Sequence, residues 1–167
     1  ATPAFAEDSR HLDAHEHGVG QLDIAFDGQS ITMELHAPGA DIVGFEYEAQ
    51  SAEDRAAVDA AVSALARPLG LFVLPDAAGC SVATASAELE SEEEHDAHDS
   101  EPEAHDDEHE DEHDHEEEAH ADAAGHTEFH AEYALSCASP DIVNEITFAY
   151  FDAFPNAREV EVQVLTD

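Results

Sequence analysis

Apolar and polar residues alternate along two short segments near the start of the chain. Three apolar residues alternate with other residues in 21–26, and three more do so in 30–36. A period of two is that of an extended strand with one buried face. Because Asp27-Gly28 lies between the segments, they predict a β-hairpin, which Pro38-Gly39 ends.

The apolar period changes to that of a helix in residues 51–66. Alanine, valine and leucine recur there every three or four residues, which places them on one stripe of an α-helix. Ser51 and Asp54 have the spacing of an N-terminal cap, and Pro68 stops the helix.

The second half of the chain returns to the period of strands. Residues 80–89 and 127–135 predict two strands, and the second has a polar face of carboxylates and imidazoles. Residues 142–154 predict a strand end running into a short helix, and residues 159–165 predict a last strand. In the segment 80–89 the alternation places Val82, Thr84 and Ser86 on one face and Ala83, Ala85, Ala87 and Leu89 on the other.

These elements predict an α+β fold with a mostly antiparallel sheet and about two helices. One compact domain is expected from residues 7–90 and 127–167. Residues 91–126 are expected to form a long disordered insertion between two neighbouring strands, since unstructured loops of this length are either functional or disordered. About 130 residues remain outside the insertion, which is enough for one core.

The insertion contains no valine, leucine, isoleucine, phenylalanine or tyrosine, so it cannot build a core. Aspartate, glutamate and histidine dominate it, and imidazole mixed with carboxylate suits zinc, copper, nickel or cobalt. Because no ligand cage is built in advance, several weak, exchangeable sites are expected. A solvated acidic loop with incidental histidines is the alternative. The histidines of the insertion are His95, His98, His105, His109, His113, His115, His120 and His126.

His109 and His113 also match the HExxH pattern of zinc proteases. A protease needs this motif on a buried helix with a third ligand and a substrate cleft. In so biased a composition the pattern is expected by chance, and neither a nucleophile motif nor a phosphate-binding loop is present. The chain is therefore not predicted to be an enzyme.

The charge of the 167-residue chain is strongly negative. It has 42 acidic residues and 4 basic ones, none of them lysine, which gives a formal net charge of −38. Such a charge repels nucleic acids and anionic membrane surfaces and attracts cations. No apolar run is long enough to span a bilayer. Adaptation to a salty exterior is an alternative explanation of the charge.

The N-terminus and the cysteines both indicate export. Ala4-Phe5-Ala6 has the form of a signal-peptide cleavage site, so residues 1–6 are interpreted as the end of an export signal, with a ragged terminus as the alternative. In an exported protein, Cys80 and Cys137 favour a disulfide, which would tie the ends of the insertion together. Zinc ligation by cysteine and histidine is the competing interpretation.

A second set of histidines lies outside the insertion or at its end. If the segment before the first strand lies beside the later strands, these residues would converge on a metal site with three or four ligands. The alternative is a set of exposed histidines without function. The candidates are His11, His15 and His17 before the first strand, His36 at the end of the second, and His126 and His130 at the start of the strand after the insertion.

Several short motifs occur in an order that resembles the ZrgA-like family of periplasmic zinc-binding proteins of Gram-negative bacteria. The resemblance extends from His15 to Val164 and includes the acidic, histidine-rich insertion. The motifs are His15-Glu16-His17-Gly18-Val19, residues 38–46, Leu74-Pro75 before Ala78-Gly79-Cys80, His130-Ala131-Glu132-Tyr133, and Phe154-Pro155.

The resemblance implies a periplasmic accessory protein that works with a high-affinity zinc importer of the ABC class. It implies a compact core with a variable histidine-rich loop, and a chain that continues somewhat beyond Val164. For this chain it suggests His15, His17 and the histidines of the insertion as ligands, with His130 as a further one, and a disulfide between Cys80 and Cys137.

Together these features predict a zinc buffer or metallochaperone that binds several zinc ions. Its expected partner is the solute-binding protein of a zinc ABC importer. A metal-dependent hydrolase with one histidine site on the core is the alternative from another functional class. Nickel, cobalt or copper binding by the same architecture is a further alternative, because affinity order alone favours copper at almost any such site.

Overall fold

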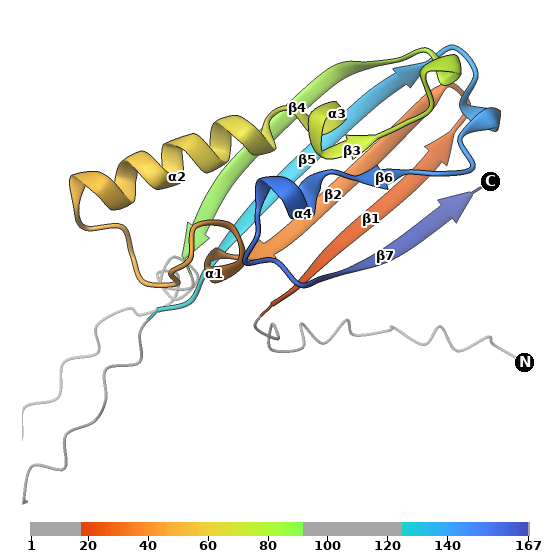
Figure 1. Ribbon diagram of the computed structural model, residues 1–167. Coiled ribbons are helices and arrows are strands. Elements are labelled where there is room, and N and C mark those ends of the chain that lie inside the picture. The colour runs from red at the N-terminus through yellow and green to blue at the C-terminus, as the bar shows by residue number, and fades with distance from the viewer. Residues whose placement is uncertain (1–17, 92–124, 167) are drawn as a thin grey trace, which may run out of the picture.

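The computed structural model describes residues 18–91 and 125–166. Its centre is a five-stranded sheet with the order β4-β5-β2-β1-β7 (Figure 1). All neighbouring strands are antiparallel except β1 and β7, which are parallel, so the prediction of a mostly antiparallel sheet is confirmed. The strands are β1 (Val19–Asp27), β2 (Ser30–Pro38), β4 (Cys80–Ser91), β5 (Thr127–Cys137) and β7 (Glu159–Thr166).

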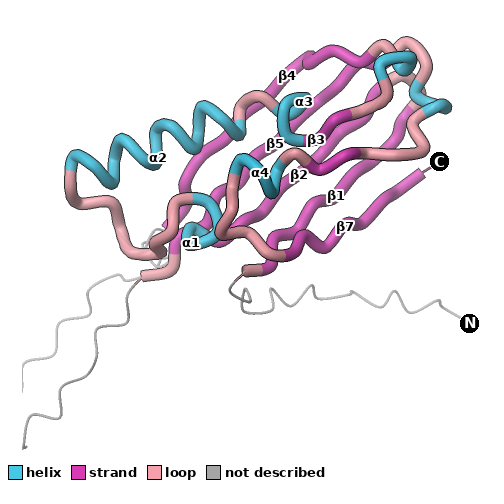
Figure 2. The backbone as a smooth tube through the Cα atoms, viewed as in Figure 1, coloured by secondary structure: helices cyan, strands magenta, loops and turns pink. Residues whose placement is uncertain are grey.

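A layer of helices and one small strand pair covers one face of this sheet (Figures 1 and 2). The described residues contain four α-helices where about two were expected, because three of them are single turns, too short to show a helical period. The layer comprises α1 (Gly39–Ile42), α2 (Ala52–Leu65), α3 (Pro68–Leu71), α4 (Tyr150–Ala153), the strands β3 (Phe72–Val73) and β6 (Thr147–Phe148), and the 3₁₀ turns η1 (Asp76–Ala78) and η3 (Pro140–Ile142).

The long helix α2 begins and ends as its sequence predicts. The Ser51 hydroxyl accepts a hydrogen bond from the Asp54 backbone N–H at 3.0 Å, and the Asp54 carboxylate accepts one from the Ser51 N–H. This capping box satisfies backbone donors that the first turn leaves unpaired. Pro68 does not extend α2 but begins α3, where its missing N–H has no cost.

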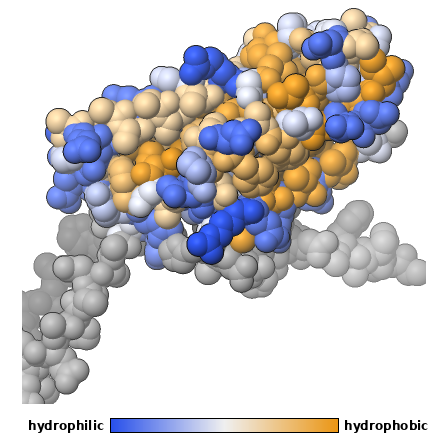
Figure 3. All heavy atoms as spheres, viewed as in Figure 1, coloured by the Kyte–Doolittle hydropathy of each residue, from blue (hydrophilic) through white to orange (hydrophobic). Residues whose placement is uncertain are grey.

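The core lies between the sheet and the helical layer. Alternate residues of β1, β2 and β5 are buried against this layer, as the period of two predicts. The rings of Phe72 and Tyr150 stack with centroids 5.9 Å apart and are both fully buried. Figure 3 shows this covered side of the molecule, with apolar residues gathered over the middle of the layer. The sheet therefore has one face in the core, and its other face, which is polar, is left open by the part of the chain that the structure describes.

A β-bulge in β4 makes one sequence prediction wrong. The register between β4 and β5 shifts between Val82 and Thr84, so that Val82 pairs with the buried Leu135. Simple alternation predicted that Val82 shares a face with Thr84 and Ser86. The bulge places Val82 on the opposite face. A bulge adds one residue to one strand and reverses the faces on its far side.

A disulfide joins Cys80 to Cys137, as expected. Both thiols are consumed in this bond, which excludes the alternative of zinc ligation by cysteine. The disulfide does not tie the ends of the insertion together, which was the role expected for it. Cys80 and Cys137 lie at one end of the β4–β5 ladder, whereas the insertion leaves from the other end, where Ser91 pairs with Thr127. The ends of the insertion are thus joined by strand pairing, and β4 extends to Ser91.

Gly39 allows the chain to pass close to β5. A Cβ atom at this position would overlap the Thr127 hydroxyl and lie 2.9 Å from the carbonyl oxygen of Phe45. Contacts this short do not occur with real side chains, so only glycine fits without movement of its neighbours.

None of the helices among the described residues is long and apolar enough to cross a membrane.

Candidate metal centre

Polar side chains of β2 and β5 meet on the open face of the sheet. Because alternate residues of a strand share a face, Glu34 and His36 of β2 lie on the same side as Glu128 and His130 of β5. The register of the two strands places His36 directly opposite His130. Strand pairing therefore brings together two imidazoles that are far apart in the sequence.

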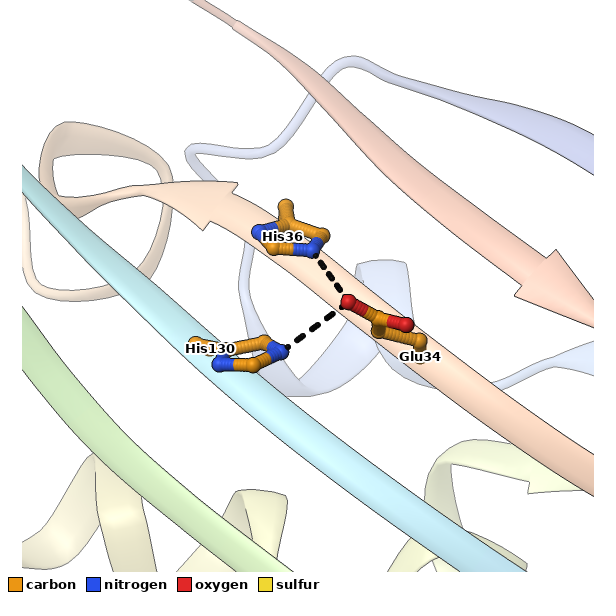
Figure 4. Close-up of side chains that lie close together, drawn as sticks. All are labelled: Glu34, His36 and His130. Carbon is orange, nitrogen blue, oxygen red and sulfur yellow. Dashed lines mark hydrogen bonds and ion pairs between the residues drawn. The ribbon is translucent and has the colours of Figure 1, made fainter.

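Glu34, His36 and His130 form a compact group, named here the inner group (Figure 4). One carboxylate oxygen of Glu34 lies 2.9 Å from Nε2 of His36 and 3.3 Å from Nε2 of His130. The two rings stack with centroids 4.5 Å apart and planes 16° apart. The possible ligand atoms of the three residues all lie within 4.8 Å of one another.

These spacings suit a zinc ion. Zinc binds imidazole nitrogen and carboxylate oxygen at about 2.0–2.2 Å, which places neighbouring tetrahedral ligands roughly 3.3 Å apart. The two distances from the Glu34 oxygen are close to this value. The third pair of ligand atoms, on His36 and His130, lies within 4.8 Å, and the two stacked rings have to tilt toward each other to share one ion. Two nitrogens and one oxygen leave a fourth coordination position for water or another ligand.

Glu128 orients the ring of His36. Nδ1 of His36 donates a hydrogen bond to Glu128 at 2.6 Å, while Nε2 faces Glu34. Metal-binding histidines commonly have a carboxylate on the nitrogen that does not bind the metal, which fixes the ring and increases its basicity. The Glu128–His36 pair therefore presents Nε2 toward the position that an ion would take.

Without an ion, the same carboxylates hold a proton on His36. Hydrogen bonds to Glu128 and then Glu34 outweigh the effect of burial and raise the pKa of His36 to about 9. The hydrogen bond from His36 in turn lowers the pKa of Glu34. At neutral pH the metal-free site is thus an imidazolium between two carboxylates, and an entering cation takes the place of that proton.

A second group of possible ligands lies toward the edge of the sheet and is named here the edge group. It consists of Glu88 and Glu90 of β4 together with His130. Glu88 pairs directly with His130 in the β4–β5 ladder, and Nδ1 of His130 lies 3.6 Å from a carboxylate oxygen of Glu90. His130 is common to the inner group and the edge group.

A groove of about 750 Å³ lies beside the inner group on the open face. Residues from all five strands line it, among them Asp23, Glu34, Glu132 and Gln163. Of the inner group, Glu34 is part of this lining, whereas His36 and His130 are not. The groove therefore has both polar and apolar walls and lies close to the histidines without enclosing them.

The structure brings together two of the predicted core ligands, His36 and His130. It places His126 elsewhere, with Nδ1 3.0 Å from a carboxylate oxygen of Glu46, and among the described residues His126 belongs to neither group. The remaining predicted ligands lie outside the described residues. They are His11, His15, His17, His95, His98, His105, His109, His113, His115 and His120.

The carboxylates of the site were not among the predicted ligands. Glu34, Glu88, Glu90 and Glu128 complete the two groups or orient their histidines. Alternation did contain a signal for two of them, because Glu34 lies two residues from His36 and Glu128 two residues from His130. Glu88 and Glu90 could be connected to His130 only through the register of β4, which the sequence does not reveal.

The chain was compared with known protein families and with curated proteins. It matches the family described as "ZrgA family zinc uptake protein" over residues 14–167, which includes β2, β4, β5 and both candidate groups. No curated protein matches it significantly. The match covers nearly the whole chain and agrees with the resemblance found in the sequence motifs. The chain therefore belongs to the ZrgA family of zinc uptake proteins.

Proposed function

We propose that this protein binds zinc as its cargo and acts in zinc uptake as a buffer or metallochaperone, without catalysing a reaction. The observation that carries the proposal is the convergence of His36, His130 and Glu34 on the open face of the sheet. Mixed nitrogen and oxygen ligands on two paired strands suit a borderline cation such as zinc better than calcium or magnesium. Membership in a zinc uptake family supports the same metal.

The core and the histidine-rich insertion have different tasks in this proposal. The insertion offers many imidazoles and carboxylates, which capture ions weakly and release them readily. The inner group has ligands on neighbouring strands, so binding there orders little additional chain and is tighter. A weak store of high capacity and one tighter site together form a buffer that can pass ions on.

We further propose that the protein works in the periplasm and delivers zinc to the solute-binding protein of a zinc ABC importer. The Cys80–Cys137 disulfide supports an oxidising compartment. The exchange of zinc between two proteins needs coordination that opens easily. The fourth position beside Glu34, His36 and His130, on an open face, meets that need.

A metal-dependent hydrolase is less well supported. Hydrolysis requires a metal-bound water that faces a substrate cleft. The groove on the open face is lined by Glu34 but by neither histidine of the inner group. Nickel, cobalt and copper stay alternatives to zinc, and competition between the metals separates them.

Growth under zinc limitation tests the proposed function. A bacterial strain that lacks its own copy of this protein is grown with a zinc chelator and supplied with the wild type, the variant H36Q/H130Q or the control H126Q. We expect the wild type and H126Q to restore growth and H36Q/H130Q to fail, with all three proteins present in the periplasmic fraction in equal amounts. Equal growth with the double variant would refute the role of the inner group in uptake.

A further inference from the structure

His130 presents its two ring nitrogens to carboxylates on two different strands. Nε2 lies 3.3 Å from an oxygen of Glu34 on β2, and Nδ1 lies 3.6 Å from an oxygen of Glu90 on β4. The ring is shared by two sets of possible ligands, since His36 completes the inner group and Glu88 completes the edge group. The side chain of His130 is only 18% exposed, so the imidazole that the two groups share is held in place by its surroundings.

A neutral imidazole offers a lone pair on one nitrogen and a proton on the other. One ion can therefore use His130 from either side, but not from both sides at once. An ion on Nδ1 leaves Nε2–H to donate to Glu34, and an ion on Nε2 leaves Nδ1–H directed at Glu90. In each state the nitrogen that the ion does not use has a carboxylate partner, as is usual for metal-bound histidine.

The two groups differ in exposure and in ligand type. The edge group has two carboxylates, Glu88 and Glu90, on the edge strand β4 and the imidazole of His130 on the neighbouring strand β5, and two of its three members are exposed. The inner group has two imidazoles and one carboxylate on β2 and β5, and only its carboxylate, Glu34, is exposed. Zinc favours nitrogen ligands over hard oxygen ligands, so the inner group is the tighter one. The edge group has more exposed ligands, so it is the more accessible one.

We propose that His130 is a relay ligand, through which zinc enters at the edge group and then moves to the inner group. This inference rests on the proposed function and deepens it. In the transfer, zinc leaves Nδ1 of His130 and the carboxylates of Glu88 and Glu90. It forms bonds to Nε2 of His130, to Nε2 of His36 and to the carboxylate of Glu34. Nε2 of His130 gives its proton to solvent through Glu34, and Nδ1 receives one from solvent through Glu90. Nε2 of His36 releases its proton to solvent as zinc binds, so both rings are neutral and nothing is oxidised or reduced.

The position of the ion on His130 tests the relay directly. The full chain is labelled with ¹⁵N-histidine, the ring signals of His130 are assigned with H130Q, and zinc is added while the ring ¹⁵N shifts are recorded. We expect the first equivalent of zinc to bind Nε2 in the wild type. In E34Q/H36Q, which keeps only the edge group, zinc in excess is expected to bind Nδ1. A His130 ring that is free of zinc or bound through Nε2 in this variant would overturn the relay.

The exchange of zinc at half saturation provides a second test that does not depend on the folding of E34Q/H36Q. We expect E88Q/E90Q to keep binding through Nε2 but to exchange zinc about tenfold more slowly, because the entry position has lost its charge. The charge-matched control is E132Q/E161Q, which also removes two carboxylates from the open face and is expected to exchange like the wild type. Equal exchange rates in all three proteins would refute the relay.

These outcomes separate the relay from the function on which it rests. If His130 of the wild type binds no zinc at all, the inner group is not the site and the proposed function fails. If the wild type binds zinc through Nε2 while E34Q/H36Q never binds it through Nδ1, the proposed function stands and only the relay is wrong.

Discussion

The imidazole rings of His36 and His130 lie stacked across the β2–β5 pair, with their centroids 4.5 Å apart. Residues opposite each other on paired strands have neighbouring side chains, so the pair is a direct product of strand register. Two such rings repel if both are charged, and Glu34 between their Nε2 atoms offsets that repulsion. A divalent cation takes the place of the ring protons, so the two rings are then neutral and this repulsion is absent.

The stability of the metal-free protein is expected to depend on His36. The pKa of His36 is about 9 in the folded protein and has a reference value of 6.5. The hydrogen bonds and ion pairs of protonated His36 stabilise the fold fully below about pH 6.5. This stabilisation disappears as the pH rises through about 9, where His36 of the folded protein loses its proton. After allowance for solvent exposure, the contribution is roughly 1–2 kcal/mol.

Urea unfolding with a chelator present measures this effect. The difference in free energy of unfolding between the wild type and H36Q is expected to be largest at pH 6 and to vanish near pH 10. The other acidic groups are the same in both proteins, so their titration cancels to a first approximation. A difference that persists at pH 10 would show that His36 acts through packing instead of charge.

The affinity for the first zinc ion is expected to rise between pH 7 and pH 9. Zinc must displace the proton of His36, and below its pKa of about 9 this competition changes the affinity by up to about tenfold per pH unit. For histidines with an ordinary pKa of about 6.5, proton competition is already weak at pH 7. Chelator competition across this range measures the slope, and the control H126Q should show the same slope. A flat profile would exclude His36 as a ligand of the tightest ion.

Replacing residues 92–124 with a short glycine-serine linker is expected to separate capacity from affinity. The ends of this segment are already joined, because Ser91 pairs with Thr127, so the sheet and its melting temperature should change little. The number of zinc ions bound should fall to about one, the ion of the inner group. Equilibrium dialysis measures this number. An unchanged capacity would show that residues 92–124 are not the store.

Gly39→Ala is expected to destabilise the protein. The added methyl group would overlap the Thr127 hydroxyl at the start of β5, next to Glu128, and the cost of such overpacking is about 1–3 kcal/mol. The matched control is Gly70→Ala, because a Cβ at Gly70 meets no atom within 4 Å. Thermal unfolding of both variants measures the difference. Equal melting temperatures would show that the backbone can shift at Gly39 without cost.

Much of the sheet could be predicted from alternation, and less of the site. The period of two predicted the strands that became β2 and β5, with His36 at the end of the first and His130 on the polar face of the second. His36 and His130 meet because of the register between β2 and β5, and alternation contains no information about register. The same register brings Glu128 to His36, although the two residues are 92 positions apart in the sequence. The bulge between Val82 and Thr84 was hidden for the same reason.

The affinity of the full chain for its first zinc ion tests the inner group most directly. It can be measured by competition with a chromophoric chelator at pH 7.5 for the wild type, H36Q/H130Q and the control H126Q, which lacks a histidine outside both groups. Loss of orienting partners alone costs 10- to 100-fold in affinity, so loss of both histidine ligands should weaken the first ion by about 100-fold or more. H126Q should bind like the wild type. An unchanged first affinity in H36Q/H130Q would contradict the assignment of the tight site to Glu34, His36 and His130.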